Sequence, residues 1–286
     1  MTAPAVIQEL TGGRLHLSHG PIDVVLKAWG EPQALRAAYA AAVRRFPELL
    51  PELCEELPQL RRPLQDKPKL AGAVARRMLE ACRPFTGVFL TPMAAVAGAV
   101  ADELLAEMLG AARLDRVFIN NGGDIAVFIA PGQALEVGIA GAFSRGNLPV
   151  LNGRLRLEAG TGVGGIATSG ARGRSFSLGI ADAVTVLGRT AAAADAAATL
   201  IANAVNLESS AVARRPASEL DADSDLGDRL VTVAVGALTA VEIETALAAG
   251  AARAEAYRRQ GLIIAAALML ARRSKVLGDA LPASRR

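Results

Sequence analysis

Hydrophobic and polar residues alternate with two different periodicities along the chain, and each periodicity predicts one kind of secondary structure. On both sides of Gly20-Pro21 apolar residues occupy alternate positions, which predicts paired strands over Arg14–Ser18 and Ile22–Ala28. From Gln33 to Leu57 apolar residues recur at the spacing of one helix face. The same periodicities predict further helices over 71–81, 91–109, 191–205 and 240–258, and further strands over 117–120, 125–129, 135–140, 155–158, 163–168, 183–187 and 230–235.

These elements predict an α+β fold with a mostly antiparallel sheet, because some strands are joined by tight turns and others by helices. A chain of 286 residues is long enough to bury a full core, either as one large domain or as two packed halves. We expect a single domain over residues 1–286, with its characteristic motifs between residues 91 and 205. The proline-rich, charged stretch 58–70 is expected to form a surface loop.

The composition argues against several classes of partner. Hydrophobic residues make up 52% of the chain, yet uncharged apolar runs such as 261–271 fall well short of the roughly 20 residues that span a bilayer. The start of the chain has neither a basic segment nor an apolar core, so we expect a cytoplasmic protein without a membrane partner. A net charge of only +3 and 3% aromatic residues argue against nucleic acid. His16 and His19, the only histidines, would point to opposite faces of a strand and form a poor metal pair.

The sharpest candidate for chemistry is a polar pair in the alanine-rich helix predicted over 191–205. Asp195 and Thr199 are four residues apart and therefore share one helix face, which Asn203 continues. A charged Asp in an apolar helix is costly unless it meets a cation, a hydrogen-bond donor or water. Mg²⁺ would suit the pair, because carboxylate and hydroxyl oxygens are its usual ligands, whereas the alternative is a structural Asp.

A glycine-rich segment over 160–170 admits two interpretations. Its first six residues match the dinucleotide-binding pattern, but residues 166–170 are too short and turn-rich for the helix that must follow, so a Rossmann site is rejected. The glycines still allow the backbone to approach a ligand, with N–H groups and the hydroxyls of Thr168 and Ser169 around a phosphate or a flavin ring. The alternative is a hairpin with bulges.

Other polar residues also have a functional and a structural interpretation. Asn120 and Asp124 flank Gly122-Gly123 and would bring polar side chains toward a cofactor, although Asn-Gly is also a strong signal for an ordinary hairpin turn. Asp102 either caps or pairs within its helix, or it binds a ligand.

Taken in order, these motifs resemble the ApbE superfamily of flavin transferases. The match begins at the small-residue stretch 91–102, continues through 120–124 and 165–170, and ends in the alanine-rich helix near residue 200. The first stretch corresponds to a Gly-Ala-x-x-Lys-Gly helix with an Asp four residues after its last Gly, which here is Asp102. The chain resembles most closely the cytoplasmic, functionally uncharacterised ApbE-like branch. This resemblance implies an α+β fold of two related β/α halves with ligand between them.

The resemblance also implies a cofactor, a metal and a reaction. ApbE enzymes bind FAD and Mg²⁺, cleave the pyrophosphate, release AMP and attach FMN to a Thr or Ser hydroxyl of an acceptor protein. By this resemblance Asp195, Thr199 and a backbone carbonyl near Ala94 hold Mg²⁺, which neutralises charge on phosphoryl oxygens. The residues implied for the flavin pocket are Asn120, Gly122, Gly123, Asp124, Gly165, Ala167, Thr168, Ser169 and Gly170.

The sequence departs from the transferases at two points. Their His-x-Ile-x-Asp-Pro-x-Thr-Gly stretch, whose histidine is thought to activate the acceptor hydroxyl, is replaced here by 176–184, which has no histidine. Asp182 is the candidate base in its place, but a carboxylate with its usual pKa of about 4 is weak in that role unless burial raises it. The lysine of the helix is Ala97 here.

Two functions from different classes follow. The first is a Mg²⁺-dependent flavin transferase or pyrophosphatase that acts on FAD or a related nucleotide. The second is a flavin- or small-ligand-binding protein without transfer chemistry. A third, weaker alternative is an enzyme that uses the same cleft for an unrelated heterocyclic substrate.

Overall fold

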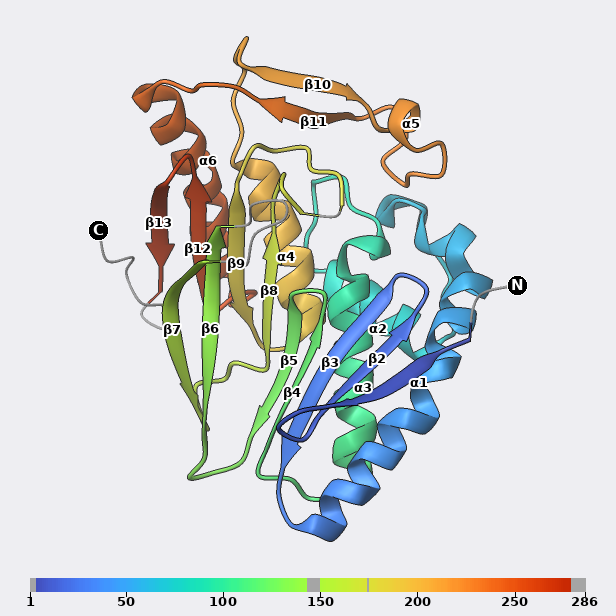
Figure 1. Cartoon of the computed structure of the whole chain (residues 1–286). Helices are drawn as coiled ribbons and strands as arrows, with labels where there is room; N and C mark the ends of the chain where they lie inside the picture. The colour runs from blue at the N-terminus through green and yellow to red at the C-terminus, as the bar shows by residue number, and fades with distance from the viewer. Residues whose placement is uncertain (1–3, 143–149, 174, 279–286) are drawn as a thin grey trace. The chain divides into compact units, whose positions relative to one another are not determined.

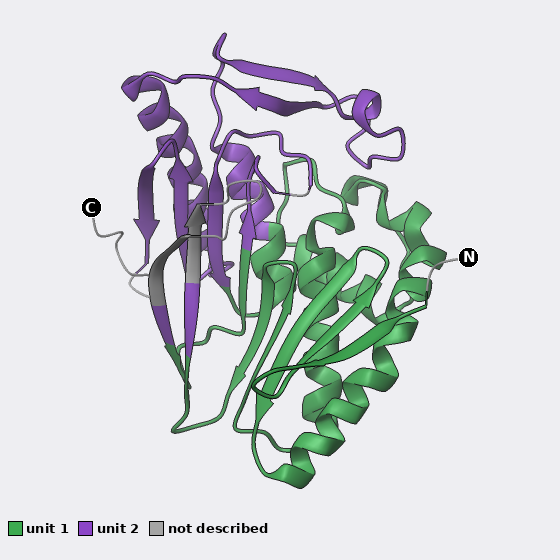
Figure 2. Ribbon diagram, viewed as in Figure 1, with its two compact units in different colours: residues 1–135, 157–167, 188–196 green, residues 136–156, 168–187, 197–286 purple. Residues whose placement is uncertain are grey.

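The computed structural model describes residues 4–142, 150–173 and 175–278 of the chain (Figure 1). Its internal contacts divide the chain into two compact units (Figure 2). Unit 1 comprises Met1–Leu135, Leu157–Ala167 and Gly188–Ala196, and unit 2 comprises Glu136–Arg156, Thr168–Leu187 and Ala197–Arg286. The division falls inside strand β8 (Gly165–Ser169) and inside helix α4 (Ala191–Ala204).

Unit 1 is built on an antiparallel sheet. Its strands in order of pairing are β1 (Val6–Leu10), β2 (Arg14–His19), β3 (Ile22–Trp29), β4 (Arg116–Asn121), β5 (Asp124–Ile129) and the start of β8. Leu17, Val24, Leu26 and Ile119 are completely buried, while their neighbours in the chain keep part of their surface exposed. This alternation directs the apolar face of the sheet toward α1 (Pro32–Leu60) and α3 (Val96–Ala111) (Figure 1).

Helix α1 is 29 residues long although it contains three prolines, Pro47, Pro51 and Pro58. Each of them removes a backbone donor from the helix, so burial of the apolar face must supply much of its stability. Phe46 and Leu49 on that face are completely buried. The helix continues to Leu60, so only residues from 61 onward in the predicted loop 58–70 lie outside it, and these include the short 3-10 helix η1 (Leu64–Asp66).

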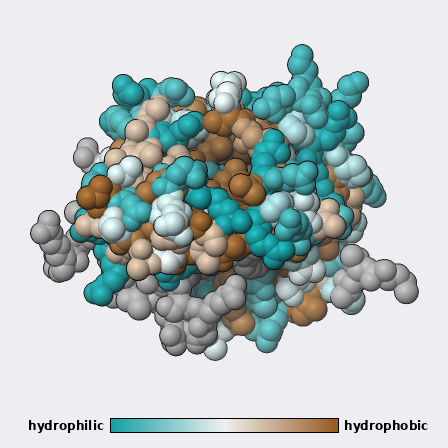
Figure 3. Space-filling view, turned by 90° about the horizontal axis from the view of Figure 1, so that it is seen from above, coloured by the Kyte–Doolittle hydropathy of each residue, from teal (hydrophilic) through white to brown (hydrophobic). Residues whose placement is uncertain are grey.

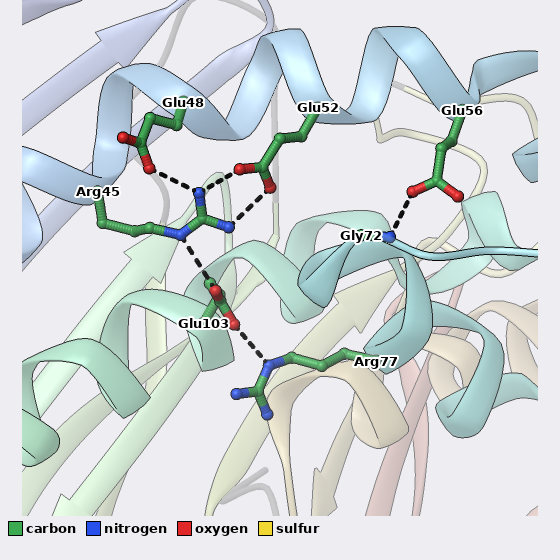
Figure 4. Close-up of polar contacts among 7 residues, drawn as sticks. All are labelled: Arg45, Glu48, Glu52, Glu56, Gly72, Arg77 and Glu103. Atoms are coloured by element: carbon green, nitrogen blue, oxygen red, sulfur yellow. Dashed lines mark hydrogen bonds and ion pairs between the residues drawn. The ribbon is translucent and has the colours of Figure 1, made fainter.

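An ionic cluster joins α1, α3 and α2 (Ala73–Cys82) (Figure 4). Arg45 of α1 donates through Nη1 and Nη2 to the two carboxylate oxygens of Glu52 at 2.6 and 2.7 Å, and through Nε to Glu103 of α3 at 3.1 Å. Arg77 of α2 donates to the other oxygen of Glu103 at 2.9 Å. The side chain of Glu103 is only 6% exposed, and its charge is tolerated there because two guanidinium groups bind it.

The N-terminus of α2 receives its cap from another helix. Glu56 of α1 accepts hydrogen bonds from the backbone N–H of Ala71 at 2.7 Å and from that of Gly72 at 2.6 Å, and the second is drawn in Figure 4. These N–H groups precede the first turn of α2, where a negative charge also interacts favourably with the helix dipole. The loop before α2 is therefore fixed by a residue that precedes it by 15 or 16 positions in the chain.

Unit 2 contains the strand order β8-β9-β12-β13, with antiparallel pairing of β9 with β12 and of β12 with β13. Helix α6 (Ala240–Arg259) packs on β12 and β13, and it begins with a capping box in which Thr239 and Glu242 exchange hydrogen bonds. Two further pairs of strands, β6 with β7 and β10 with β11, form separate two-stranded sheets. The remaining bounds are β6 (Ala134–Ala142), β7 (Val150–Glu158), β9 (Ala183–Gly188), β10 (Val212–Pro216), α5 (Ala217–Leu220), β11 (Leu230–Val235), β12 (Ala265–Leu270) and β13 (Arg273–Leu277).

Helix α4 is buried along most of its length. Ala194 and Ala198 have no exposed surface, and most of the other alanines of the helix are also buried. Their small side chains allow other backbone segments to come close, and a Cβ on Gly179 of unit 2 would overlap the carbonyl oxygen of Ala202. The alanine that raises the hydrophobic fraction of the sequence therefore serves close packing in this helix.

The predicted α+β fold with mostly antiparallel pairing is confirmed. Strand Leu230–Val235 has the predicted bounds, and the rejection of a Rossmann site is also confirmed, because the glycine run leads into strand β8 and not into a helix. The short strands β1, β10 and β13 were not predicted. All five residues of β1 keep exposed surface, so its sequence lacks the alternation that marks a half-buried strand.

On the face drawn in Figure 3, hydrophilic and hydrophobic residues are interspersed. In the described part of the chain, no helix combines the length and the apolar composition required to cross a membrane.

Candidate functional site

Asp102 of α3 caps the N-terminus of α4. Its Oδ1 accepts a hydrogen bond from the N–H of Ala191 at 3.0 Å, and its Oδ2 accepts one from the N–H of Ala192 at 2.8 Å. Both donors belong to the first turn of α4, which cannot satisfy them internally. Burial raises the pKa of Asp102, while the two N–H groups and the positive charge of Arg77 oppose this rise.

Asp195 of α4 makes the reciprocal contact with the first turn of α3. Its Oδ2 accepts a hydrogen bond from the N–H of Gly98 at 3.1 Å, and the N–H of Ala97 is a second donor. Burial raises the pKa of Asp195 well above its ordinary value, and the negative charges of Asp124 and Asp102 add to this rise. Asp195 therefore has hydrogen-bond donors, as the structural interpretation requires, and also a second carboxylate whose charge opposes its own.

The contact between α3 and α4 depends on Gly98. A Cβ at this position would overlap the carbonyl group of Ala191 and lie 2.6 Å from the nitrogen of Ala192. No side chain fits between backbone segments at such distances. Gly98 therefore allows the first turns of α3 and α4 to meet, which is the condition for both aspartate caps.

Gly122 and Gly123 form the two-residue turn between β4 and β5. Their φ angles are 66° and 116°, values that favour glycine and are typical of tight hairpin turns. The Oδ1 of Asn120 accepts a hydrogen bond from the N–H of Gly123 at 2.8 Å. The structural interpretation of this motif is therefore confirmed, while contact of Asn120, Gly122 and Gly123 with a cofactor stays a prediction.

Asn121, which directly precedes this turn, contacts the first turn of α3. Asn121 donates from Nδ2 to the carbonyl oxygen of Ala97 at 3.1 Å, and its Oδ1 accepts from the N–H of Asp23 at 3.3 Å. Asp124 begins β5, and its negative charge acts on Asp195. The turn and the first residues of α3 and α4 thus bring two carboxylates together in unit 1.

The carboxylates of Asp124 and Asp195 could supply two of the oxygen ligands that a divalent cation requires. Asp124 and Asp195 repel one another, and a cation would relieve that repulsion. Within residues 4–142, 150–173 and 175–278, no group of three or more His, Cys, Asp or Glu side chains is arranged to hold a metal ion. Mg²⁺ would therefore take most of its shell from neutral oxygens, water and phosphate, which is its usual behaviour in nucleotide sites.

His16 and His19 lie on opposite faces of β2, as predicted.

The other two predicted metal ligands lie on the same segments of chain. Ala94 is in the 3-10 helix η2 (Pro92–Ala95), directly before α3. Thr199 follows Asp195 by one turn of α4 and is half-buried. Asp195 belongs to unit 1 and Thr199 to unit 2. Their roles as ligands stay predictions.

Gly165 and Ala167 begin β8 within unit 1. A Cβ on Gly165 would overlap the backbone nitrogen of Ala191, so glycine is required where β8 passes the start of α4. Ala167 is completely buried. Both residues have a packing role, and their place in a flavin pocket stays a prediction.

Thr168, Ser169 and Gly170 continue this segment within unit 2. The hydroxyl of Thr168 lies 3.0 Å from the hydroxyl of Thr185 on β9. A Cβ on Gly170 would lie 2.7 Å from the carbonyl oxygen of Asp182, while Ser169 is half-buried. These contacts hold the segment in place, and binding of a ligand by it stays a prediction.

Asp182 is held by two partners within unit 2. Its Oδ2 accepts a hydrogen bond from the N–H of Ala271 at 2.7 Å, and its Oδ1 lies 2.7 Å from the Nε of Arg172. Ala271 and Arg272 form the two-residue turn between β12 and β13, and both have positive φ angles of 48° and 65°. Asp182 therefore stabilises a turn that lacks the glycine such turns prefer, and its role as a catalytic base stays a prediction.

Sequence reasoning considered Asp102 but did not identify α4 as its partner, and it did not single out Gly98. The signal was present, because Gly98 and Asp102 are four residues apart and share one face of α3. Asp102 and its partner Ala191 are 89 residues apart in the chain, so no local sequence pattern indicates the contact.

Comparisons with known proteins support a family assignment. The model of the family described as AbpE bacteria matches residues 7–279. The UPF0280 protein of Methanothrix thermoacetophila is 39% identical over 141 residues, which are 49% of this chain and 55% of that protein. The UPF0280 protein of Methanopyrus kandleri is 39% identical over 165 residues, which are 58% of this chain and 62% of that protein. The chain thus spans about half to three fifths of the length of these relatives.

Two solved structures also resemble the chain at low sequence identity. The ApbE protein from Thermotoga maritima has a TM-score of 0.39 and 12% identity, with 73% of this chain and 88% of that chain covered. The apo form of the flavinyl transferase ApbE from Pseudomonas stutzeri has a TM-score of 0.38 and 11% identity, with 97% and 96% covered.

Proposed function

We propose, because this chain belongs to the family described as AbpE bacteria, that it binds FAD or a related nucleotide together with Mg²⁺. The prediction of an ApbE-like chain, made from the motifs over 91–205, is confirmed by this membership. The ligand and the metal are proposed from the residues of the site described above.

The observation that carries the proposal is the pair of carboxylates Asp124 and Asp195. They come from β5 and α4, and their charges oppose one another where burial already disfavours the ionised form of Asp195. A divalent cation between such groups would stabilise both as carboxylates. In the proposal the carbonyl of Ala94, which is also in unit 1, adds a neutral oxygen ligand. Bound Mg²⁺ would neutralise charge on the phosphate oxygens of the nucleotide.

The nucleotide itself would be bound by the glycine-containing segments of unit 1, residues 122–124 and 165–167. Backbone N–H groups of these segments that make no hydrogen bond within the fold would donate to phosphate oxygens, and the N–H of Gly123, which donates to Asn120, is not one of them. The space beside Gly123 is open, because a Cβ there would meet nothing within 4 Å, so a ligand could approach the backbone of the β4–β5 turn.

We favour ligand binding over transfer that uses Asp182 as a base. Both carboxylate oxygens of Asp182 already have partners, Ala271 and Arg172, and the first of these contacts fixes a turn of the fold. A general base must be able to contact the hydroxyl that it deprotonates. Transfer or hydrolysis would then depend on another group.

The test is a titration of the purified protein with FAD, with and without Mg²⁺, followed by flavin fluorescence, with AMP and FMN sought by chromatography. We expect binding that requires Mg²⁺ and that weakens at least about tenfold in Asp195→Asn and Asp124→Asn, because each removes a charged ligand. Glu107→Gln, an exposed position on α3, is the matched control and should bind as the unaltered protein does.

Two results would contradict the proposal. One is the absence of FAD binding under both conditions, and the other is unchanged Mg²⁺-dependent binding in both aspartate variants. Circular dichroism of each variant separates loss of binding from loss of the fold. Release of AMP by the unaltered protein would add phosphoryl-transfer chemistry to binding, and Asp182→Asn would then show whether that residue takes part.

A further inference from the structure

A groove in unit 1 has no part in the function proposed above. It lies beside the C-terminal end of α2 and has a volume of about 500 Å³, within the range of small-molecule sites. Its lining comes from the segment around η1, the last turn of α2 and the loop after α2. The apolar lining residues are Leu64, Pro68, Leu79, Phe85 and Val88.

The charged residues that line this groove are both cations, Lys67 and Arg83. Neither forms an ion pair with any residue in the described part of the chain. Asp66, the acidic neighbour of Lys67, lies 3.8 Å from Arg62 instead. The groove therefore combines positive charge with an apolar wall, and Thr86 adds a hydroxyl group to the lining.

The backbone at Lys67 points to a role for its side chain. Its φ angle is 50°, in the left-handed region that glycine and asparagine adopt at lower cost than lysine does. The N–H of Lys67 donates to the carbonyl oxygen of Leu64 at 3.0 Å, so η1 imposes this conformation. The chain thus carries a lysine at a position where its backbone is disfavoured, and strain of this kind is concentrated at ligand sites.

We propose that this groove binds a small anion with an apolar body, of the class of aliphatic carboxylates or nucleoside monophosphates. Lys67 and Arg83 supply the positive charge for the anionic group, while Leu79 and Phe85 are part of the surface for the apolar body. Both cations are exposed, so most of the binding free energy comes from the apolar contact and the charges select the anion.

The test uses anilinonaphthalene sulfonate, an anionic probe whose fluorescence increases in an apolar site. We expect one probe per chain, and an affinity at least about tenfold lower in the double variant Lys67→Gln/Arg83→Gln. The control is Arg62→Gln/Lys69→Gln, which removes the same charge from exposed residues outside the groove and should bind as the unaltered protein does. The uncharged analogue phenylnaphthylamine should bind all three proteins alike.

Competition identifies the anion. Displacement of the probe by octanoate indicates an aliphatic carboxylate, displacement by AMP indicates a nucleoside phosphate, and displacement by neither overturns the proposal. An equal effect of the two double variants also overturns it. Asp195→Asn should leave probe binding unchanged, and a loss of binding in that variant would assign the probe to the site of the proposed function.

Discussion

Asp102 and Asp195 cap each other's helices, because each carboxylate accepts backbone N–H groups from the first turn of the helix that carries the other. Each charge is therefore placed at the positive end of a helix dipole, and this offsets part of the cost of burial. The two caps exist only when α3 and α4 are both formed, so the helices stabilise each other.

Replacement of Asp102 by Ala should destabilise the protein. The N–H groups of Ala191 and Ala192 would lose their acceptor, and we expect the free energy of unfolding to fall by about 1–3 kcal/mol. Urea unfolding measures this change. Glu107→Ala, at an exposed position of the same helix, should change the free energy by no more than about 0.5 kcal/mol. Equal losses in the two variants would show that the cap contributes nothing.

Gly98 and Gly110 offer a matched pair of substitutions on α3. Gly98→Ala should cost more than about 3 kcal/mol or prevent folding, because the added Cβ would overlap the backbone of Ala191. Gly110→Ala meets nothing within 4 Å and should stabilise the helix by about 0.5–1 kcal/mol. Thermal unfolding of both variants checks the opposite signs, and a stable Gly98→Ala would mean that α3 and α4 can separate without cost.

The contrast between these glycines shows what the sequence could predict. The motifs over 91–102, 120–124, 165–170 and 194–199, taken in order, were enough to indicate an ApbE-like chain, and hydrophobic periodicity located most of the strands and helices. Periodicity reports which face of an element is buried, but it does not report the segment that covers that face. The role of Gly98 depends on Ala191, which is far away in the chain, so only the folded structure reveals it.

The candidate site was predictable to a similar degree. The sequence indicated that Asp195 needs a donor or a cation, and the structure supplies Gly98 as a donor and Asp124 as a neighbouring charge. The contact of Asp182 with Ala271 was not predictable, because Ala-Arg is an unusual pair for a two-residue hairpin turn.

The turn between β12 and β13 should accept a stabilising substitution. Ala271 and Arg272 both have positive φ, which costs residues with a Cβ roughly 1 kcal/mol or more each. The double variant Ala271→Asn/Arg272→Gly should therefore raise the free energy of unfolding by about 1–2 kcal/mol. Chemical denaturation provides the measurement, and a decrease in stability would show that this turn is not the tight hairpin that its φ angles indicate.

The ionic cluster around Arg45 predicts a specific dependence on pH. The hydrogen bond from Arg45 lowers the pKa of Glu52, so this group stabilises the fold above its unfolded pKa of about 4.5 and loses that effect as pH falls through the lower folded value. Glu52→Gln should lower the melting temperature by a few degrees at neutral pH. The difference from the unaltered protein should vanish when the pH falls below the folded pKa of Glu52.

The control for this pH dependence is Glu55→Gln, an exposed position on the same helix. Its melting temperature should follow that of the unaltered protein at every pH. A difference between Glu52→Gln and the unaltered protein that persists in acid would assign the effect to packing of the side chain and not to its charge.

The two units are made of interleaved segments of the chain, and this affects the order in which their contacts can form during translation. Unit 1 is incomplete until residue 196 has been synthesised, and the carboxylate that caps α3 follows the capped Gly98 by 97 residues. During translation the ribosome therefore releases α1, α2 and α3 long before the last contact of their unit exists. For the same reason no single cut in the gene separates the two units.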